Sequence, residues 1–490
     1  MKKYRCNICG YEVELEKLDD EYICPICGQK HVFELVEEEI EEKILDKAIP
    51  IDEENISIQR IVEKCIDCGT CTRVCPVSSY IKEGNLDACL GCGMCIKRCP
   101  VGALTPKYVY NQVLEDIKNP EKKVVVIVSP AVRVAVGDGF GFEYGTNVDK
   151  KLVTALKNIG FDYVFDTSYG ADLTIMEEAN ELVERINNQG TSDKQGTLPM
   201  FTSCCPAWVK YFEMHYPDKL NHLSTCKSPI AMQSAILKTY FCKENNINPK
   251  DLVVVALTPC TAKKQEIKRK ELDGYTDYVI TTSEIINMFK ENNIDLSSVN
   301  DTEFDRMFTG TGAGLIFGHT GGVMIAAIRT TYHLLTNEEL DLDKVNFEVL
   351  SENNNIKKAT IKIKDKYLKV AVVNGIENAK TLIDDIDNKK IDLDFVEVMT
   401  CTGGCISGGG QPLVPLNKEQ EITKLRIDGL KNTDKVMEVR YSHMNQNINK
   451  LYDDYLSSPL SNKAHELLHT TYQDKSSVIK SSNTFDINKN

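Results

Sequence analysis

The stretch Phe395–Pro412, FVEVMTCTGGCISGGGQP, joins a strand-like segment to a cysteine loop. Its apolar, β-branched start predicts a buried strand. Cys401 and Cys405 follow on a loop or first helical turn, where both thiols can face one object. The glycines after Cys405 permit a sharp turn and a close approach of the backbone to something bulky. We therefore expect this loop to hold a large group.

Two other cysteine loops also follow strand-like segments. Residues 200–208 read MFTSCCPAW, and residues 253–266 read VVVALTPCTAKKQE. If the three loops converge, they supply four thiolates, which is enough for one iron–sulfur cluster. The alternative is that these are core residues, because free cysteine is among the most buried residue types.

Together the loops resemble the three signature segments of the [FeFe]-hydrogenases. The matching patterns are TSCCPxW at 202–208, xPCxxKxxE at 258–266 and ExMxCxGGCxxGGGQP at 397–412. The resemblance extends over residues 61–472. It departs from the family's common residues at Ala207, Thr258 and Ile325, none of which is a predicted cluster ligand.

Composition limits the class of protein. The 490 residues suffice for about three domains, and 42% hydrophobic residues allow a large core. The net charge of −14 argues against nucleic acid as a partner. The sequence shows no signal segment and no apolar run near the roughly 20 residues that span a bilayer. We therefore expect a cytoplasmic protein in which the 19 cysteines bind metal rather than form disulfides.

Residues 1–36 form a predicted metal domain. Two Cys-x2-Cys-Gly segments contribute Cys6, Cys9, Cys24 and Cys27. Facing each other, they make a tetrahedral four-sulfur site that suits iron or zinc. The flanking residues resemble a shortened rubredoxin, which favours iron while leaving structural zinc open.

Residues 37–60 are predicted to be an acidic linker helix, and residues 61–105 contain an internal repeat. Each copy has the spacing of the bacterial ferredoxin run, in which the fourth cysteine ligates the other cluster. One [4Fe–4S] cluster should use Cys65, Cys68, Cys71 and Cys99, and the other Cys89, Cys92, Cys95 and Cys75.

From residue 106 to 472 apolar strands alternate with amphipathic helices. We predict strands at 123–128, 161–165 and 276–281, and helices at 148–159, 174–186 and 283–291. The expected fold is an α/β catalytic domain of two lobes, with parallel sheets covered by helices. Ferredoxin-like α+β and rubredoxin-like domains precede it. Residues 187–198 should be a surface loop, and residues 473–490 a frayed polar tail.

The resemblance implies that the catalytic domain holds an H-cluster. Its [4Fe–4S] part would be bound by Cys205, Cys260, Cys401 and Cys405. Cys405 would bridge to a two-iron subsite bearing CO, cyanide and a dithiolate amine, which dedicated maturation proteins would supply. Lys263 would donate to one cyanide, whereas its neighbour Lys264 is expected at the surface. The residues predicted to surround the subsite are Ser129, Pro130, Ala131, Met399 and Phe317.

Proton reduction also needs a proton route. Cys204 diverges from its neighbour Cys205, so its thiol is predicted to be free, with a pKa near the ordinary value of roughly 8.5. The resemblance extends the route to Glu178, Ser224, Glu181 and Arg185. Without that context, the charged trio on this helix would be interpreted as a surface salt-bridge ladder.

The sequence thus predicts a hydrogenase that interconverts protons and H2 and takes electrons from a ferredoxin-type or rubredoxin-type carrier. Lys97 and Arg98 are candidates for docking an acidic carrier, or else are simply solvated. The alternatives are an iron–sulfur assembly or carrier protein on the same scaffold, or an H2 sensor.

Overall fold

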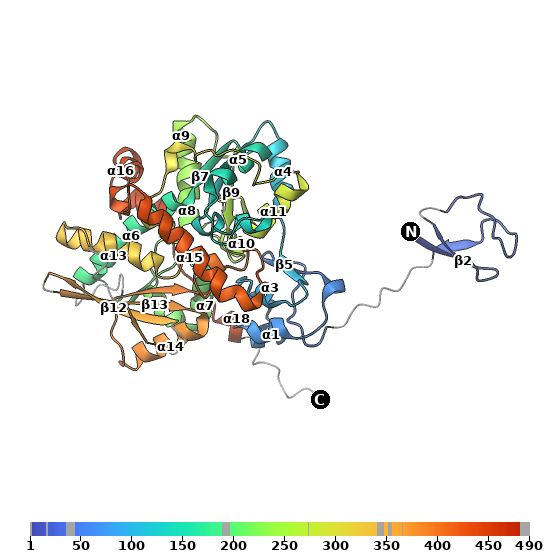
Figure 1. Ribbon diagram of the computed structural model, residues 1–490. Helices are drawn as coiled ribbons and strands as arrows, with labels where there is room; N and C mark the ends of the chain where they lie inside the picture. Colours follow the sequence, from blue (N-terminus) through green and yellow to red (C-terminus); the bar gives the residue numbers. More distant parts are fainter. Residues whose placement is uncertain are drawn as a thin grey trace. The chain divides into compact units, whose positions relative to one another are not determined.

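The computed structural model describes residues 2–15, 18–35, 45–188, 197–272, 274–340, 347–350, 355–364 and 366–480 (Figure 1). The chain forms two compact units, Met1–Asp46 and Lys47–Asn490. Residues 37–44 of the predicted linker helix and residues 189–196 of the predicted loop at 187–198 lie outside the described residues.

The described remainder of the linker, residues 45–60, is not helical and ends in strand β4 (Ile58–Arg60), so the helix prediction is wrong there. Side chains take up its backbone amides instead, because Asp67 accepts from Lys47 N and Ala48 N, and Asn55 accepts from Ser57 N and Ile58 N.

The first unit contains a three-stranded antiparallel sheet. Its strand order is β2 (Glu12–Leu15), β1 (Lys2–Cys6) and β3 (Phe33–Leu35). The two cysteine turns follow β1 and precede β3, so the sheet brings them together.

The second unit begins with the internal repeat. Strands β4 (Ile58–Arg60) and β5 (Leu104–Pro106) pair antiparallel and frame helices α1 (Thr70–Val74) and α3 (Met94–Arg98). Each helix follows a glycine with a left-handed backbone, Gly69 (φ 70°) and Gly93 (φ 74°). The repeat in sequence is therefore also a repeat in structure.

The first large sheet is entirely parallel, as predicted. Its strand order is β10 (Tyr278–Thr281), β9 (Leu252–Thr258), β6 (Lys123–Val128) and β7 (Tyr163–Asp166). One face packs on α5 (Asp149–Ile159) and α11 (Thr282–Glu291). The other face packs on α6 (Thr167–Asn187) and α8 (Pro229–Ile236). Both faces are covered, which explains the continuously apolar strands.

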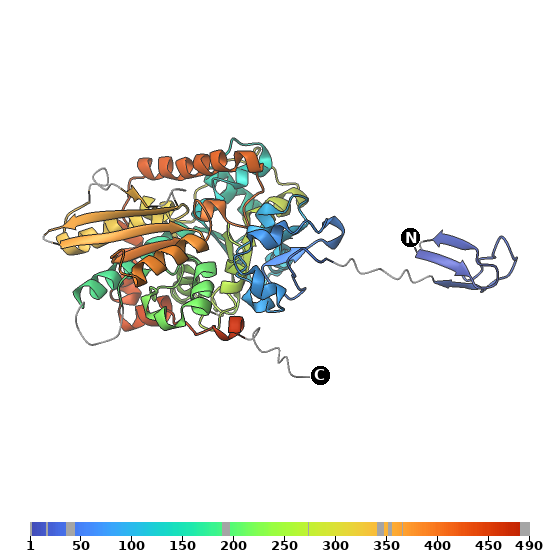
Figure 2. The same cartoon turned by 90° about the horizontal axis from the view of Figure 1, so that it is seen from below.

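The second sheet differs from the prediction because it is mixed. Its order is β11 (Glu348–Val349), β12 (Ile356–Ile363), β13 (Lys366–Asn374), β14 (Phe395–Met399) and β8 (Met200–Phe201) (Figure 2). β11, β12 and β13 pair antiparallel, and only β13, β14 and β8 run parallel. Polar and apolar residues alternate along β12, as expected for antiparallel strands that expose one face to solvent.

Helix α13 (Gly322–Thr336) covers this sheet beside α6 (Figure 1). Its N-terminus is capped by Glu397, the one acidic residue of β14, whose carboxylate accepts from Gly321 N (2.7 Å) and Met324 N (2.8 Å). This explains a buried glutamate in an otherwise apolar strand, because carboxylates are stabilised at helix N-termini.

The C-terminal part of the chain wraps over both lobes. It comprises α15 (Glu419–Val436), α16 (Gln446–Leu451), α17 (Asn462–Leu468) and α18 (Ser477–Lys480). Residues 473–480 of the predicted frayed tail are folded instead. Lys475 and Gln473 N both bond to the buried Glu213 carboxylate of α7 (Pro206–His215), which fixes this segment.

Two adjacent threonines at the start of α11 give a stability test. Thr281 forms a capping box with Glu284, whereas the buried Thr282 hydroxyl has no hydrogen-bond partner among the described residues. We expect Thr281→Val to lower the free energy of unfolding by about 1 kcal/mol. Thr282→Val should be neutral or stabilising, because it removes an unsatisfied group without changing shape. Urea denaturation checks both, and equal losses would contradict this account of the helix start.

Candidate metal centres and active site

The three cysteine loops meet where strands of the two large sheets end. β8 pairs with β14 in parallel register, Met200 opposite Phe395, so the loops carrying Cys205 and Cys401 leave the sheet side by side. β9 of the other sheet ends at Thr258 and leads to Cys260. Carboxyl ends of parallel strands are the usual location of sites in α/β folds.

These loops enclose one cavity with few polar groups. Cys205, Cys260, Cys401 and Cys405 all line it. So do the other residues predicted for this place, namely Cys204, Lys263, Ser129, Pro130, Ala131, Phe317 and Met399. The structure therefore brings the whole predicted cluster environment together from five separate segments.

The glycines of the third loop permit close backbone packing around the cavity. A Cβ on Gly408 would lie 2.3 Å from Pro259 O, and one on Gly409 would lie 2.6 Å from Cys92 O. Any larger residue would push the loop away from Cys260 on one side and from the ferredoxin-like segment on the other.

The chemistry of the four thiols fits an iron–sulfur cluster. Burial raises the pKa of Cys260 to about 12 and that of Cys401 to about 11, and mutual repulsion with Cys205 adds to both shifts. Cys260 and Cys401 thus ionise poorly without a cation. Soft thiolate ligands that lose their protons on binding suit iron, which would neutralise this charge.

Lys263 points an ammonium group into the same cavity. Its Nζ lies 2.8 Å from Glu266 Oε2 and donates to Cys204 O at 3.1 Å. Burial alone would lower the pKa of Lys263, but the Glu266 carboxylate outweighs it and raises the pKa. Lys263 is therefore a fixed cation. Lys264, expected at the surface, is instead buried and paired with Glu284 at 3.0 Å.

Three of the predicted proton-route residues, Ser224, Glu181 and Arg185, are joined by hydrogen bonds. Ser224 Oγ donates to Glu181 Oε2 at 2.9 Å, and Arg185 Nη2 donates to Glu181 Oε1 at 2.6 Å. Glu178, Glu181 and Arg185 are 2%, 7% and 4% exposed, so the surface-ladder interpretation is wrong. The trio lies on α6 beneath the cavity.

Glu178 and Cys204, two residues of the predicted proton route, have raised pKa values. Burial raises the pKa of Glu178 to about 8, with repulsion from Glu181 next in importance. Burial, followed by the charge of Glu178, raises the pKa of Cys204 well above its usual value. The predicted ordinary thiol pKa is therefore wrong for Cys204.

The ferredoxin-like cysteines separate into two groups of four. Cys65, Cys68, Cys71 and Cys99 line one small cavity. In the other group, burial is the main cause that raises the pKa of Cys75, Cys92 and Cys95. The charge of Cys89 adds to the pKa shifts of Cys75 and Cys95, and the charges of Cys95 and Cys75 add to that of Cys92, so the four lie close together. Cys401 also raises the pKa of Cys92, which places this second group beside the main cavity.

Lys97 and Arg98 form neither a docking patch nor a solvated pair. Lys97 Nζ lies 2.9 Å from Glu419 Oε1 and donates to Ser407 O at 2.9 Å. Arg98 Nη1 lies 2.5 Å from Glu419 Oε2. Both basic side chains thus anchor the ferredoxin-like segment to α15 and to the glycine loop, through partners more than 300 residues away.

The N-terminal unit forms its predicted four-sulfur cluster. Cys6 Sγ lies 3.6 Å from Cys27 Sγ, and Cys9 Sγ lies 3.5 Å from Cys24 Sγ. All four sulfur atoms lie within 4.8 Å of one another. A tetrahedral site with metal–sulfur bonds of roughly 2.3 Å requires this arrangement.

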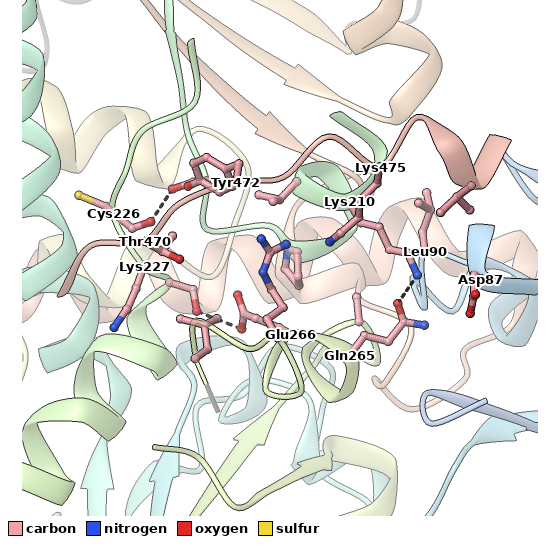
Figure 3. Close-up of a pocket in the computed structure, with 18 residues that line it drawn as sticks. Asp87, Leu90, Lys210, Cys226, Lys227, Gln265, Glu266, Thr470, Tyr472 and Lys475 are labelled. Atoms are coloured by element: carbon pink, nitrogen blue, oxygen red, sulfur yellow. Dashed lines mark hydrogen bonds between the residues drawn. The ribbon is translucent and has the colours of Figure 1, made fainter. Parts of the chain in front are cut away.

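A second cavity, of about 350 Å³, is lined by Lys210, Gln265 and Glu266 among others (Figure 3). Glu266 belongs to its wall while bonding to Lys263 of the main cavity, so this ion pair separates the two spaces. Arg269 and Lys475 also line the second cavity. Glu266 is part of the sequence motif at 258–266, but no role was predicted for it. Its position three residues after Lys263 could have indicated the ion pair, because residues three apart on a helix are neighbours.

Gln411 and Thr400 were also missed. Gln411 Nε2 donates to Ala131 O at 3.0 Å, tying the glycine loop to the segment at 129–131. Thr400 Oγ1 lies 3.3 Å from Cys205 Sγ. Both flank predicted cysteines in the sequence, but their partners are distant along the chain, and no local pattern identifies such contacts.

Family comparisons agree with this arrangement. Residues 122–409 match the model described as iron only hydrogenase large subunit, C-terminal domain. Residues 420–475 match iron hydrogenase small subunit, and residues 57–100 match a 4Fe-4S dicluster domain. The fold and the cysteine sites thus define an iron–sulfur protein of the hydrogenase type.

Individual relatives support the same assignment. Iron hydrogenase 1 of Clostridium pasteurianum is 40% identical over 455 residues, covering 87% of this chain and 78% of the relative. The NADP-reducing hydrogenase subunit HndD of Solidesulfovibrio fructosivorans is 40% identical over 413 residues, 83% of this chain, and the match spans 66% of the relative's length. The chain belongs to the iron-only hydrogenase family.

The chain is also similar to a solved hydrogenase structure and to an iron–sulfur assembly factor. A variant of apo [FeFe]-hydrogenase HydA1 from Chlamydomonas reinhardtii matches with TM-score 0.67 and 39% identity, covering 74% of this chain and 98% of that one. The cytosolic Fe-S cluster assembly factor narfl of Danio rerio is 30% identical, covering 76% of this chain and 91% of the relative. In the described part of the chain, no helix is long and apolar enough to cross a membrane.

The raised pKa of Glu178 predicts a pH dependence of stability. Between the ordinary value of 4.5 and the folded value of about 8, the unfolded chain loses this proton while the folded protein keeps it. Stability from this group is therefore lost as the pH rises through about 8. Glu178→Gln removes the titration, so its free energy of unfolding should fall less than that of the native protein between about pH 6 and about pH 9. Parallel urea curves at each pH measure this, and identical slopes for both proteins would refute a raised pKa.

Proposed function

We propose that the protein is an [FeFe]-hydrogenase that reversibly reduces protons to H2 at an H-cluster. The observation that supports this most strongly is the single cavity that gathers four cysteines, a fixed lysine and a spare thiol. In this proposal Cys205, Cys260, Cys401 and Cys405 would hold the [4Fe–4S] part, and Cys405 would also serve as the link to the two-iron subsite. The cluster, when bound, supplies the redox chemistry of H2 formation.

The cavity residues would hold and orient the subsite. Lys263 places a permanent positive charge where an anionic ligand such as cyanide needs a donor, and Glu266 keeps the ammonium in place. Met399 and Phe317, 2% and 6% exposed, supply apolar walls that keep water out. Ser129, Pro130 and Ala131 also line the cavity.

Protons would travel along the buried chain. Cys204 borders the cavity and stays protonated, so it can give a proton to the site and be reloaded from Glu178. Glu178 has a pKa of about 8 and can exchange a proton near neutral pH. Ser224 connects to Glu181, and Arg185 holds the Glu181 carboxylate in position. Each transfer moves one proton and leaves its donor to be reprotonated from the next group outward.

Electrons would pass through two [4Fe–4S] clusters. The group of Cys65, Cys68, Cys71 and Cys99 includes the exposed Cys68 and is the entry point for a ferredoxin-type or rubredoxin-type carrier. The group of Cys75, Cys89, Cys92 and Cys95 lies beside Cys401 and delivers to the active site. The N-terminal unit would hold one iron, with zinc as the alternative. Maturation proteins would install the two-iron subsite, and the reduced thiols fit the cytoplasm.

A second candidate function is iron–sulfur assembly, which the resemblance to narfl supports. The enzyme is favoured because Lys263, Cys204 and the glycine loop through Pro412 are all retained. A protein that only carries a cubane needs neither a free thiol connected to buried carboxylates nor a cation beyond the four cysteines.

Replacing the spare thiol tests the proton route. Cys204→Ala should lower H2 evolution of matured protein by at least about a hundredfold, because general acid catalysis is lost, while iron content stays the same. Cys242→Ala, which removes another buried thiol outside the cavity, should keep normal activity. Viologen-driven H2 assays and iron analysis measure both. Near-normal turnover by the Cys204 variant would refute its assigned role.

The electron route can be separated from the active site. Cys68→Ser disturbs the outermost predicted cluster, so ferredoxin-driven H2 evolution should fall strongly. Exchange of H2 with deuterated solvent should persist, because it requires the active site and the proton route but no net electron supply. Loss of both activities to the same degree would contradict the assigned order of the clusters.

A further inference from the structure

Three potential metal-ligating side chains meet at the end of α13, away from the sites above. His333 is in the last turn of α13, Glu339 follows that helix, and His443 belongs to the short helix Ser442–Met444. His333 Nδ1 lies 2.9 Å from Glu339 Oε1, and His443 Nε2 lies 3.1 Å from the same oxygen. Two imidazole nitrogens thus converge on one carboxylate oxygen.

Both nitrogen atoms can present a lone pair to an ion, although His443 Nε2 in its other tautomer would donate to Glu339 Oε1 at 3.1 Å. His333 Nδ1 is enclosed and, within the described residues, makes no hydrogen bond of acceptable angle, although Glu339 is so close. His443 Nδ1 lies 3.3 Å from Thr330 Oγ1, and a proton on Nδ1 donated to that hydroxyl leaves the Nε2 lone pair facing Glu339. Metal-bound histidines commonly use their other ring nitrogen in this way.

The protonation state of His443 and the solvent exposure of the cluster also suit metal binding. Burial lowers the pKa of His443, and repulsion from His333 contributes, so its neutral, ligating form is favoured. The rings stack with centroids 4.1 Å apart, which would be unfavourable for two charged imidazoliums. The His333 and Glu339 side chains are 31% and 34% exposed, so an ion can enter from solvent.

We infer that His333, Glu339 and His443 form a binding site for a divalent transition metal, with zinc as the best match. Zinc bonds of roughly 2.0–2.2 Å give tetrahedron edges of about 3.3 Å. The observed separations of 2.9 and 3.1 Å need only small outward shifts to meet that value. Two imidazoles with one carboxylate select zinc over magnesium or calcium, which prefer oxygen alone. Water would fill the fourth position.

The location defines what the ion would do. Arg329, one turn earlier on α13, already donates to Arg440 O at 2.9 Å and pairs with Asp434 at 3.3 Å. A metal on His333, Glu339 and His443 would add a second link between this helix and the C-terminal segment. The site is therefore structural, and it stabilises the packing of α13 against residues 440–445.

Zinc content of matured, cluster-loaded protein tests the site. After anaerobic incubation with zinc alone and removal of excess, the native protein should retain one zinc more than His443→Gln or Glu339→Gln. Glu338→Gln removes a neighbouring carboxylate that belongs to no ligand group and should retain as much zinc as the native protein. Because the cluster cysteines are the same in every variant, their zinc cancels in the difference. The native protein and Glu338→Gln should also melt at a higher temperature with zinc than without, whereas His443→Gln and Glu339→Gln should not.

A crystal of the native protein soaked in zinc gives a result that does not depend on any variant. An anomalous peak at the zinc edge between His333, Glu339 and His443 is expected. No peak there, or equal zinc content in native protein and Glu339→Gln, would overturn the inference.

Discussion

The structure depends on the convergence of three backbone loops at the ends of parallel strands from two different sheets. The third loop is fixed by hydrogen bonds to the second loop and to the neighbouring segments that contain Gly318 and Ser283. Gly410 N donates to Pro259 O at 2.8 Å, Ile406 N to Gly318 O at 2.9 Å, and Ser283 N to Gly410 O at 3.0 Å. These bonds are possible only because glycine allows the third loop to lie against its neighbours. As a result, the four cysteines on these loops all line one cavity.

The same packing explains how charge is tolerated inside the protein. Burying charged groups is costly unless each finds a partner. Lys263 has Glu266, Lys264 has Glu284, and Arg185 has Glu181, in ion pairs of 3.0 Å or less. Glu178 has no comparable cation, and burial keeps it protonated near neutral pH. Buried Glu397 and Asp172 also lack a cation but accept several hydrogen bonds, whereas Glu178 Oε2 has no hydrogen-bond partner among the described residues. A carboxyl held in this way is suited to exchanging protons.

Local spacing in the sequence was sufficient for the cysteine sites. The ferredoxin run determined which four cysteines would share a cavity, including the crossing of Cys99 to the first group, because such ligands come from one short repeat. Strand and helix periodicity located β6, α5 and α11 within a residue or two. The convergence of the three loops was anticipated through family resemblance, since nothing in their spacing places one beside another.

Contacts between residues far apart in the sequence could not be predicted from local patterns. Lys97 and Lys264 looked like surface residues because their partners Glu419 and Glu284 are far along the chain. The folded segment at 473–480 depends on Glu213 in the same way. The antiparallel part of the second sheet also went unpredicted, because the strands at 356–374 were not among the segments identified from the sequence.

The most direct test of the central claim is iron anomalous diffraction from a crystal of the matured protein. The account predicts iron within bonding distance of the sulfur atoms of Cys205, Cys260, Cys401 and Cys405, with further iron attached through Cys405 on the side of Met399. Zinc in that cavity, no metal, or iron bound by a different set of residues would contradict it.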